Sequence, residues 1–95
     1  MIHIQITNDC IKVSGHGDKI MCNTVSILIQ FISSCIPLVD YKSTYGNVTA
    51  YFKDSELTDV LINKLIKFII DLNTTEIFLD LRGGKYATYN RYSGL

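Results

Sequence analysis

The sequence has no tryptophan, one proline and two histidines, and its charges cancel, with nine Lys and Arg against nine Asp and Glu. Without an excess of positive charge, the chain has no strong field that would attract nucleic acid or anionic lipid. Three cysteines are too few and too unevenly spaced for a disulfide framework. No CxxC pair occurs, and two histidines make a closed zinc site improbable. We therefore expect no closed zinc site.

The composition is that of a small folded domain. Apolar residues make up 47% of the 95 residues and charged residues 19%, which excludes intrinsic disorder. The length leaves room for one core only, so we expect a single domain over residues 1–95. A neutral and rather apolar surface protects poorly against association. This predicts a homodimer that buries part of the apolar surface.

An uncharged run over residues 20–39 is long enough to cross a bilayer. Its polar residues Asn23, Ser26, Gln30 and Ser33 follow one another at helical spacing, however, and form a single stripe. This favours an amphipathic helix packed on a core. The N-terminus alternates polar and apolar residues and has no basic segment, so no signal peptide is expected. We expect a soluble cytoplasmic protein without a membrane partner.

The first part of the chain predicts a hairpin followed by a helix. Ile2, Ile4 and Ile6 alternate with polar residues, as in a half-buried strand. Asn8-Asp9 suits a tight turn, and a second strand over 10–14 ends at Gly15-His16-Gly17, where two glycines free the backbone. A helix over 19–35 follows, and Pro37 closes it.

The second part repeats this pattern. Residues 38–45 and 48–53 flank Gly46-Asn47 as a second hairpin. Asp54 or Ser55 caps a second amphipathic helix that continues to residue 72, and residues 76–81 form a last strand before a tyrosine-rich tail. The order β-β-α-β-β-α-β predicts an α+β two-layer sandwich, a mostly antiparallel sheet with two helices on one face.

One segment concentrates the residues that could carry chemistry. Cys22 lies in the first turn of the predicted helix, where the unpaired N–H groups and the helix dipole stabilise a thiolate. His16 stands at the end of the preceding strand, and the loop between them can fold back to form a Cys–His pair. The helix start would also supply N–H donors to an oxyanion.

Neighbouring residues would support this pair. Ser26 lies one turn after Cys22 on the same face, and Gly15 and Gly17 flank the histidine. We expect residues 17–20 to form a mobile loop that orders over a substrate.

Gly15-His16, a short gap and Cys22-x-x-Val25-Ser26 opening a helix resemble the ribosomal-processing cysteine protease family (Prp). The order of elements is also similar. The resemblance implies a cytoplasmic homodimer without metal or cofactor, with Cys22 as nucleophile and His16 as general base. Its members trim the N-terminal extension of a large-subunit ribosomal protein. The chain departs from the family in its shorter His-to-Cys gap and in having Lys19 where the family has an aspartate.

Two other interpretations remain open. The first is a non-catalytic module of the same fold, a dimer that is associated with the ribosome or binds a peptide. The second is an RNA-binding tail, because aromatic rings and arginine can stack on bases; zero net charge instead favours tail packing or a dimer contact. The tail residues concerned are Tyr86, Tyr89, Tyr92 and Arg91. We expect Cys10 and Cys35 to be core or strand-face thiols, His3 a surface residue, and Asp80 and Arg82 an ion pair.

Overall fold

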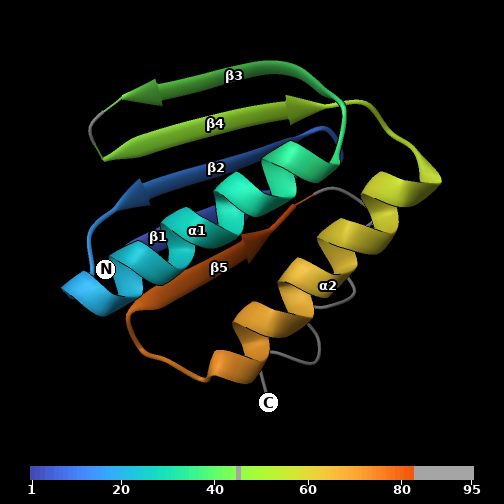
Figure 1. Ribbon diagram of the computed structural model, residues 1–95. Coiled ribbons are helices and arrows are strands. Elements are labelled where there is room, and N and C mark those ends of the chain that lie inside the picture. Colours follow the sequence, from blue (N-terminus) through green and yellow to red (C-terminus); the bar gives the residue numbers. More distant parts are fainter. Residues whose placement is uncertain (45, 83–95) are drawn as a thin grey trace.

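A computed structural model describes residues 1–44 and 46–82. The predicted order of elements is confirmed (Figure 1): β1 (Ile2–Ile6), β2 (Cys10–Gly15), α1 (Lys19–Cys35), β3 (Leu38–Thr44), β4 (Asn47–Phe52), α2 (Glu56–Leu72) and β5 (Ile77–Leu81). Tyr45, which we placed at the end of a strand, and the tyrosine-rich tail with its possible RNA contacts lie outside the described residues.

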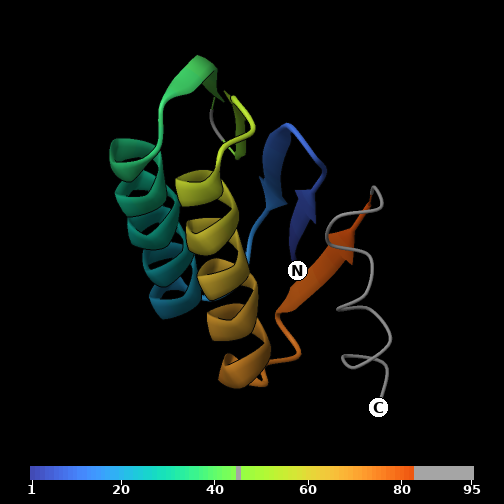
Figure 2. The ribbon, with the colours of Figure 1, turned by 90° about the vertical axis from the view of Figure 1, so that its right-hand side faces the viewer.

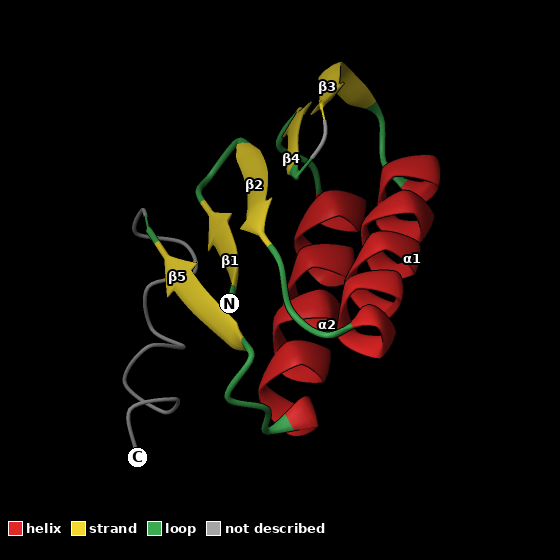
Figure 3. Cartoon of the chain, turned by 90° about the vertical axis from the view of Figure 1, so that its left-hand side faces the viewer, coloured by secondary structure: helices red, strands yellow, loops and turns green. Residues whose placement is uncertain are grey.

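The sheet has five strands in the order β3-β4-β2-β1-β5. Three of its neighbouring pairs are antiparallel, whereas β5 runs parallel to β1. The sheet is therefore mixed, because α2 carries the chain back across the sheet before β5 begins. Both helices cover the same face (Figures 2 and 3). The predicted α+β sandwich is confirmed.

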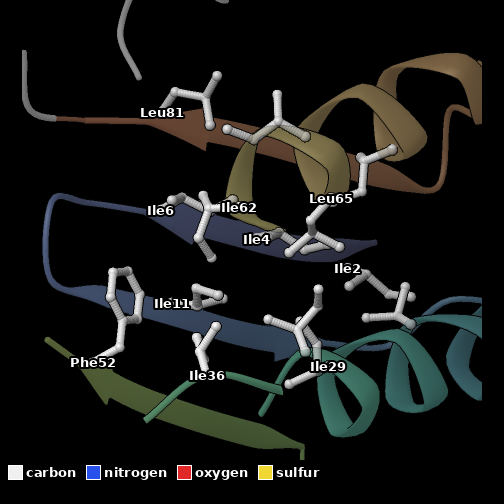
Figure 4. Packing of buried hydrophobic residues seen from close by; sticks show 14 residues of the cluster. Ile2, Ile4, Ile6, Ile11, Ile29, Ile36, Phe52, Ile62, Leu65 and Leu81 are labelled. Carbon is white, nitrogen blue, oxygen red and sulfur yellow. The ribbon is translucent and has the colours of Figure 1, made fainter. Parts of the chain in front are cut away.

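The core lies between this face and the helices. Ile2, Ile4 and Ile6 point into it from β1 and are at most 2% exposed, because alternate side chains of a strand face the same side. Figure 4 shows them beside Ile62 and Leu65 of α2. Burying each such side chain contributes about 1.5–3 kcal/mol. The isoleucine alternation at the start of the sequence thus sets the orientation of β1.

Both helices begin with a side-chain cap. The Met21 N–H donates to the Asp18 carboxylate at 2.7 Å, and the Thr58 N–H donates to the Ser55 hydroxyl at 3.1 Å. Such caps satisfy N–H groups that the first turn leaves without a partner. They fix α1 to begin directly after the segment that carries His16.

The outer side of the helix layer keeps many apolar side chains in contact with solvent. The large apolar residues exposed there are Ile20, Ile27 and Phe31 on α1 and Leu57, Val60 and Phe68 on α2. The predicted polar stripe lies on the flank of α1, where Ser26 and Gln30 are exposed and line a pocket. Within the described residues, neither helix has the length and apolarity needed to cross a membrane.

Candidate functional site

A pocket of about 230 Å³ lies between the flank of α1 and the strands β2, β3 and β4. Four of the five site residues predicted from the sequence line it, namely Gly15, His16, Cys22 and Ser26. The other lining residues are Ile2, Val13, Val25, Ile29, Gln30, Tyr41, Ser43, Thr44, Gly46, Asn47 and Val48. The fold thus collects residues from five elements and two connecting segments around the predicted Cys–His pair.

Gly15 is required by its backbone conformation. Its φ of 87° lies in the left-handed region that favours glycine, and a Cβ at this position would collide with the carbonyl oxygen of Met1. The Gly15 N–H donates to the carbonyl oxygen of Gly46 at 3.2 Å. This bond ties the end of β2 to the turn between β3 and β4.

The His16 imidazole lies against the same turn. A Cβ built on Gly46 would lie 3.1 Å from the Nε2 of His16, so a side chain there would press on the ring. Sequence analysis placed Gly46 in a turn but gave no reason to place it beside the histidine. The second hairpin therefore forms part of the site.

The Cys22 sulfur is held by the segment before α1. The Gly17 N–H donates to Sγ at 3.3 Å, and the thiol can donate to the carbonyl oxygen of Gly17 at 3.5 Å. Gly17, the fifth predicted site residue, therefore contacts the thiol directly through its backbone. Gly17 N–H is a donor that can stabilise negative charge on the sulfur.

The N–H groups at the helix start are engaged differently from our expectation. The Cys22 N–H donates to the carbonyl oxygen of Asp18 at 2.9 Å, and the Met21 N–H donates to the Asp18 carboxylate. These two donors are satisfied within the helix and its cap. An oxyanion would have to displace one of them or use another donor.

The pKa of Asp18 is lowered, first by the hydrogen bond from the Met21 N–H and next by the side chain of Glu76. The N–H of Asp18 donates to Oε1 of Glu76 at 2.8 Å. Glu76 directly precedes β5, so this hydrogen bond joins the loop before α1 to the edge strand of the sheet. Glu76 could not be predicted as part of the site from the sequence, because only the parallel pairing of β1 and β5 brings it there.

The loop between β2 and α1 is shorter than predicted. Lys19 and Ile20 already belong to α1, which leaves residues 16–18 as the connection. His16 accepts a hydrogen bond through its carbonyl oxygen, and Gly17 and Asp18 donate through their N–H groups. Residues 17 and 18 of the predicted loop are thus held by hydrogen bonds, and the ordering of this loop over a substrate stays a prediction.

The flank of α1 extends the site beyond Cys22. Ser26 and Gln30 follow at intervals of one turn, and Gln30 Nε2 donates to the Ser26 hydroxyl at 3.1 Å. Ser26 therefore presents its oxygen to Gln30. Gln30 was part of the predicted polar stripe but had no assigned role. Below this polar edge, Val25 and Ile29 help to form an apolar floor.

The other singled-out residues lie outside this pocket. Cys10 is buried as expected, whereas Cys35 is exposed near the end of α1, so its assignment to the core or to a strand face is wrong. His3 is exposed, as predicted, and its ring lies 5.6 Å from that of Phe78. The predicted Asp80–Arg82 ion pair is confirmed at 2.9 Å.

Comparison with known proteins adds no assignment. The chain matches no model of a protein family, and a search of curated proteins finds no relative.

Proposed function

We propose that the protein is a hydrolase that uses the Cys22 thiol as its nucleophile and His16 as general base and acid. One observation carries the proposal: the Cys22 sulfur, with the Gly17 N–H donating to it, lines the same pocket as the His16 imidazole. A thiol and an imidazole in one cavity are the two groups that nucleophilic catalysis by cysteine requires. The pocket also offers an apolar floor and a polar edge, which suit a peptide side chain and its backbone.

The proposed reaction is the cleavage of an amide. His16 takes the thiol proton, and the thiolate forms a bond to the carbonyl carbon of the substrate. The carbon–nitrogen bond then breaks as His16 gives its proton to the leaving amine. Water, deprotonated by His16, hydrolyses the resulting thioester and restores the thiol.

Within this class, we propose a cysteine endopeptidase that trims the N-terminal extension of a large-subunit ribosomal protein in the cytoplasm. The support is the resemblance of Gly15-His16 and Cys22-x-x-Val25-Ser26 to the ribosomal-processing cysteine protease family. All five of these residues line one pocket, with Val25 in its floor.

A non-catalytic peptide-binding module is the second candidate. The observation that favours it is the engagement of the Met21 and Cys22 N–H groups by Asp18. Removing one oxyanion donor from a peptidase costs about 3–4 kcal/mol of transition-state stabilisation. With these two helix donors occupied, such a site would bind a peptide without cutting it.

Mass spectrometry of candidate ribosomal proteins, incubated with the protein, distinguishes the two. We expect the wild type and Cys35→Ala to shorten the substrate at its N-terminus and Cys22→Ala to leave it intact while still binding it. Cys35→Ala is the matched control because that thiol is exposed and outside the pocket. Cleavage by Cys22→Ala would refute the nucleophile. Binding without cleavage by the wild type would favour the second candidate.

We also propose that the chain is a homodimer. The exposed Ile27 and Phe31 of α1 and Phe68 of α2 are 66%, 60% and 44% exposed, and such apolar patches mark interaction surfaces. Sedimentation at tens of micromolar should give the mass of two chains, and Phe31→Asp should shift it towards one. A wild type that stays a monomer would contradict the proposal.

A further inference from the structure

Two consecutive peptide groups present opposite atoms to the Cys22 sulfur. The group between His16 and Gly17 offers its N–H, at 3.3 Å from Sγ. The next group, between Gly17 and Asp18, offers its C=O, at 3.5 Å. A donor beside sulfur favours the thiolate, whereas an acceptor favours the protonated thiol. The balance between the two states therefore depends on how each peptide group is oriented.

Each of these groups is held from its other side. In a trans peptide the C=O and N–H point in opposite directions. The carbonyl oxygen of His16 accepts a hydrogen bond from the amino group of Met1 at 2.6 Å. The N–H of Asp18 donates to Glu76 Oε1 at 2.8 Å. Glu76 is thus the side chain that fixes the group whose carbonyl faces the thiol.

We propose that Glu76 is a positioning residue that holds the Gly17 carbonyl against the Cys22 thiol. Without this acceptor, the peptide group between Gly17 and Asp18 can turn its N–H towards the sulfur. This rotation changes ψ of Gly17 and φ of Asp18, and Gly17 resists its share least because it has no Cβ to restrict its backbone. The inference deepens the proposed function, on which it rests, by naming what controls its nucleophile.

The surroundings of Cys22 contain other titratable groups that the test must separate. These are His16, Asp18, Tyr41 and the amino group of Met1, besides Glu76 itself. A carboxylate also disfavours a nearby thiolate through its charge alone. Glu76→Gln removes this charge and keeps an oxygen that can accept from the Asp18 N–H. Glu76→Ala removes both.

Alkylation of the full chain by iodoacetamide across a range of pH, followed by peptide mapping, measures each cysteine separately. We expect Glu76→Ala to move the Cys22 profile to lower pH, with a severalfold faster reaction on the acid side. Glu76→Gln should keep the wild-type profile. Glu56→Ala is the matched control, since Glu56 is exposed in the first turn of α2.

Each other outcome overturns the proposal. An unchanged or upward-moved profile in Glu76→Ala would mean that the carbonyl does not control the thiol. Equal shifts in Ala and Gln would mean that charge acts, not position. Faster alkylation of buried Cys10 in Glu76→Ala would show general loosening of the fold. None of these readouts requires peptide cleavage, so failure of this inference and failure of the peptidase proposal are distinguishable.

Discussion

The two helices begin in the same way and lead to different surroundings. In α1, the Cys22 N–H donates to the carbonyl oxygen of the cap residue Asp18 at 2.9 Å, and in α2 the Asp59 N–H donates to that of Ser55, also at 2.9 Å. Cys22 and Asp59 therefore occupy equivalent helical positions. Cys22 lines the pocket described above, whereas Asp59 is not among the residues that line it.

The difference lies in what surrounds each cap. At α2, Thr58 is fully buried, and the hydroxyl of Ser55 donates to that of Thr58 at 2.9 Å, so the cap serves packing. At α1, Asp18 is exposed, its N–H is bound by Glu76, and Gly17 contacts the thiol. A helix N-terminus alone does not make a site. The loop before it and the hairpin opposite supply what α2 lacks.

The largest expected effect concerns His16, whose imidazole lies against the turn between β3 and β4. His16→Ala should lower peptidase activity by about 10²–10⁴-fold, because the thiol then loses its general base. His3→Ala is the matched control, since this histidine lies on the sheet face opposite the helices. Rates of cleavage of the cognate peptide measure both. Equal losses in the two variants would show that the effect is not specific to the pocket.

A smaller effect concerns the stability that each helix cap contributes, which should depend on pH for α1 and not for α2. Ser55→Ala should lower the free energy of unfolding by about 1 kcal/mol at any pH. Asp18→Ala should lower it only where Asp18 is ionised. Because the pKa of Asp18 in the folded protein lies below its usual value of 3.8, this contribution is present above 3.8 and is lost as the pH falls through the lower folded value.

Urea unfolding at neutral and at strongly acid pH measures this difference. The gap between wild type and Asp18→Ala should close in acid, and the gap for Ser55→Ala should persist. Asp18→Asn should retain most of the stability at neutral pH, because asparagine is also a good cap. A gap for Asp18→Ala that is independent of pH would show that the ionised carboxyl does not stabilise α1.

The elements could be predicted from the sequence because their signals are local. Alternating Ile2, Ile4 and Ile6 and the apolar stripe over residues 57–72 reveal strand and helix without knowledge of the rest. The parallel pairing of β5 with β1 could not be predicted in this way, since it depends on where the chain returns after α2. The strand order could not be predicted for the same reason, since it depends on the path of the chain between the strands.

In the candidate site, too, the residues close together in sequence could be predicted and the remote ones could not. Cys22, His16 and Ser26 lie close together in sequence, and their types and spacing indicate a thiol site. Glu76 and Gly46 are remote in sequence and reach the site only through tertiary structure. The use of helix donors by Asp18 was also missed, although the predicted helix start at residue 19 places an aspartate at the cap position, where its carboxylate can accept from a helical N–H.

Competitive alkylation of the wild type at neutral pH, with peptide mapping of all three cysteines, tests the central claim that Cys22 is the reactive thiol. Exposure alone predicts the order Cys35, Cys22, Cys10, since these are exposed, half-buried and buried. An activated nucleophile reacts according to its thiolate character instead. We predict that Cys22 reacts far faster than Cys35. Reaction of Cys35 first, with Cys22 second, would contradict the account.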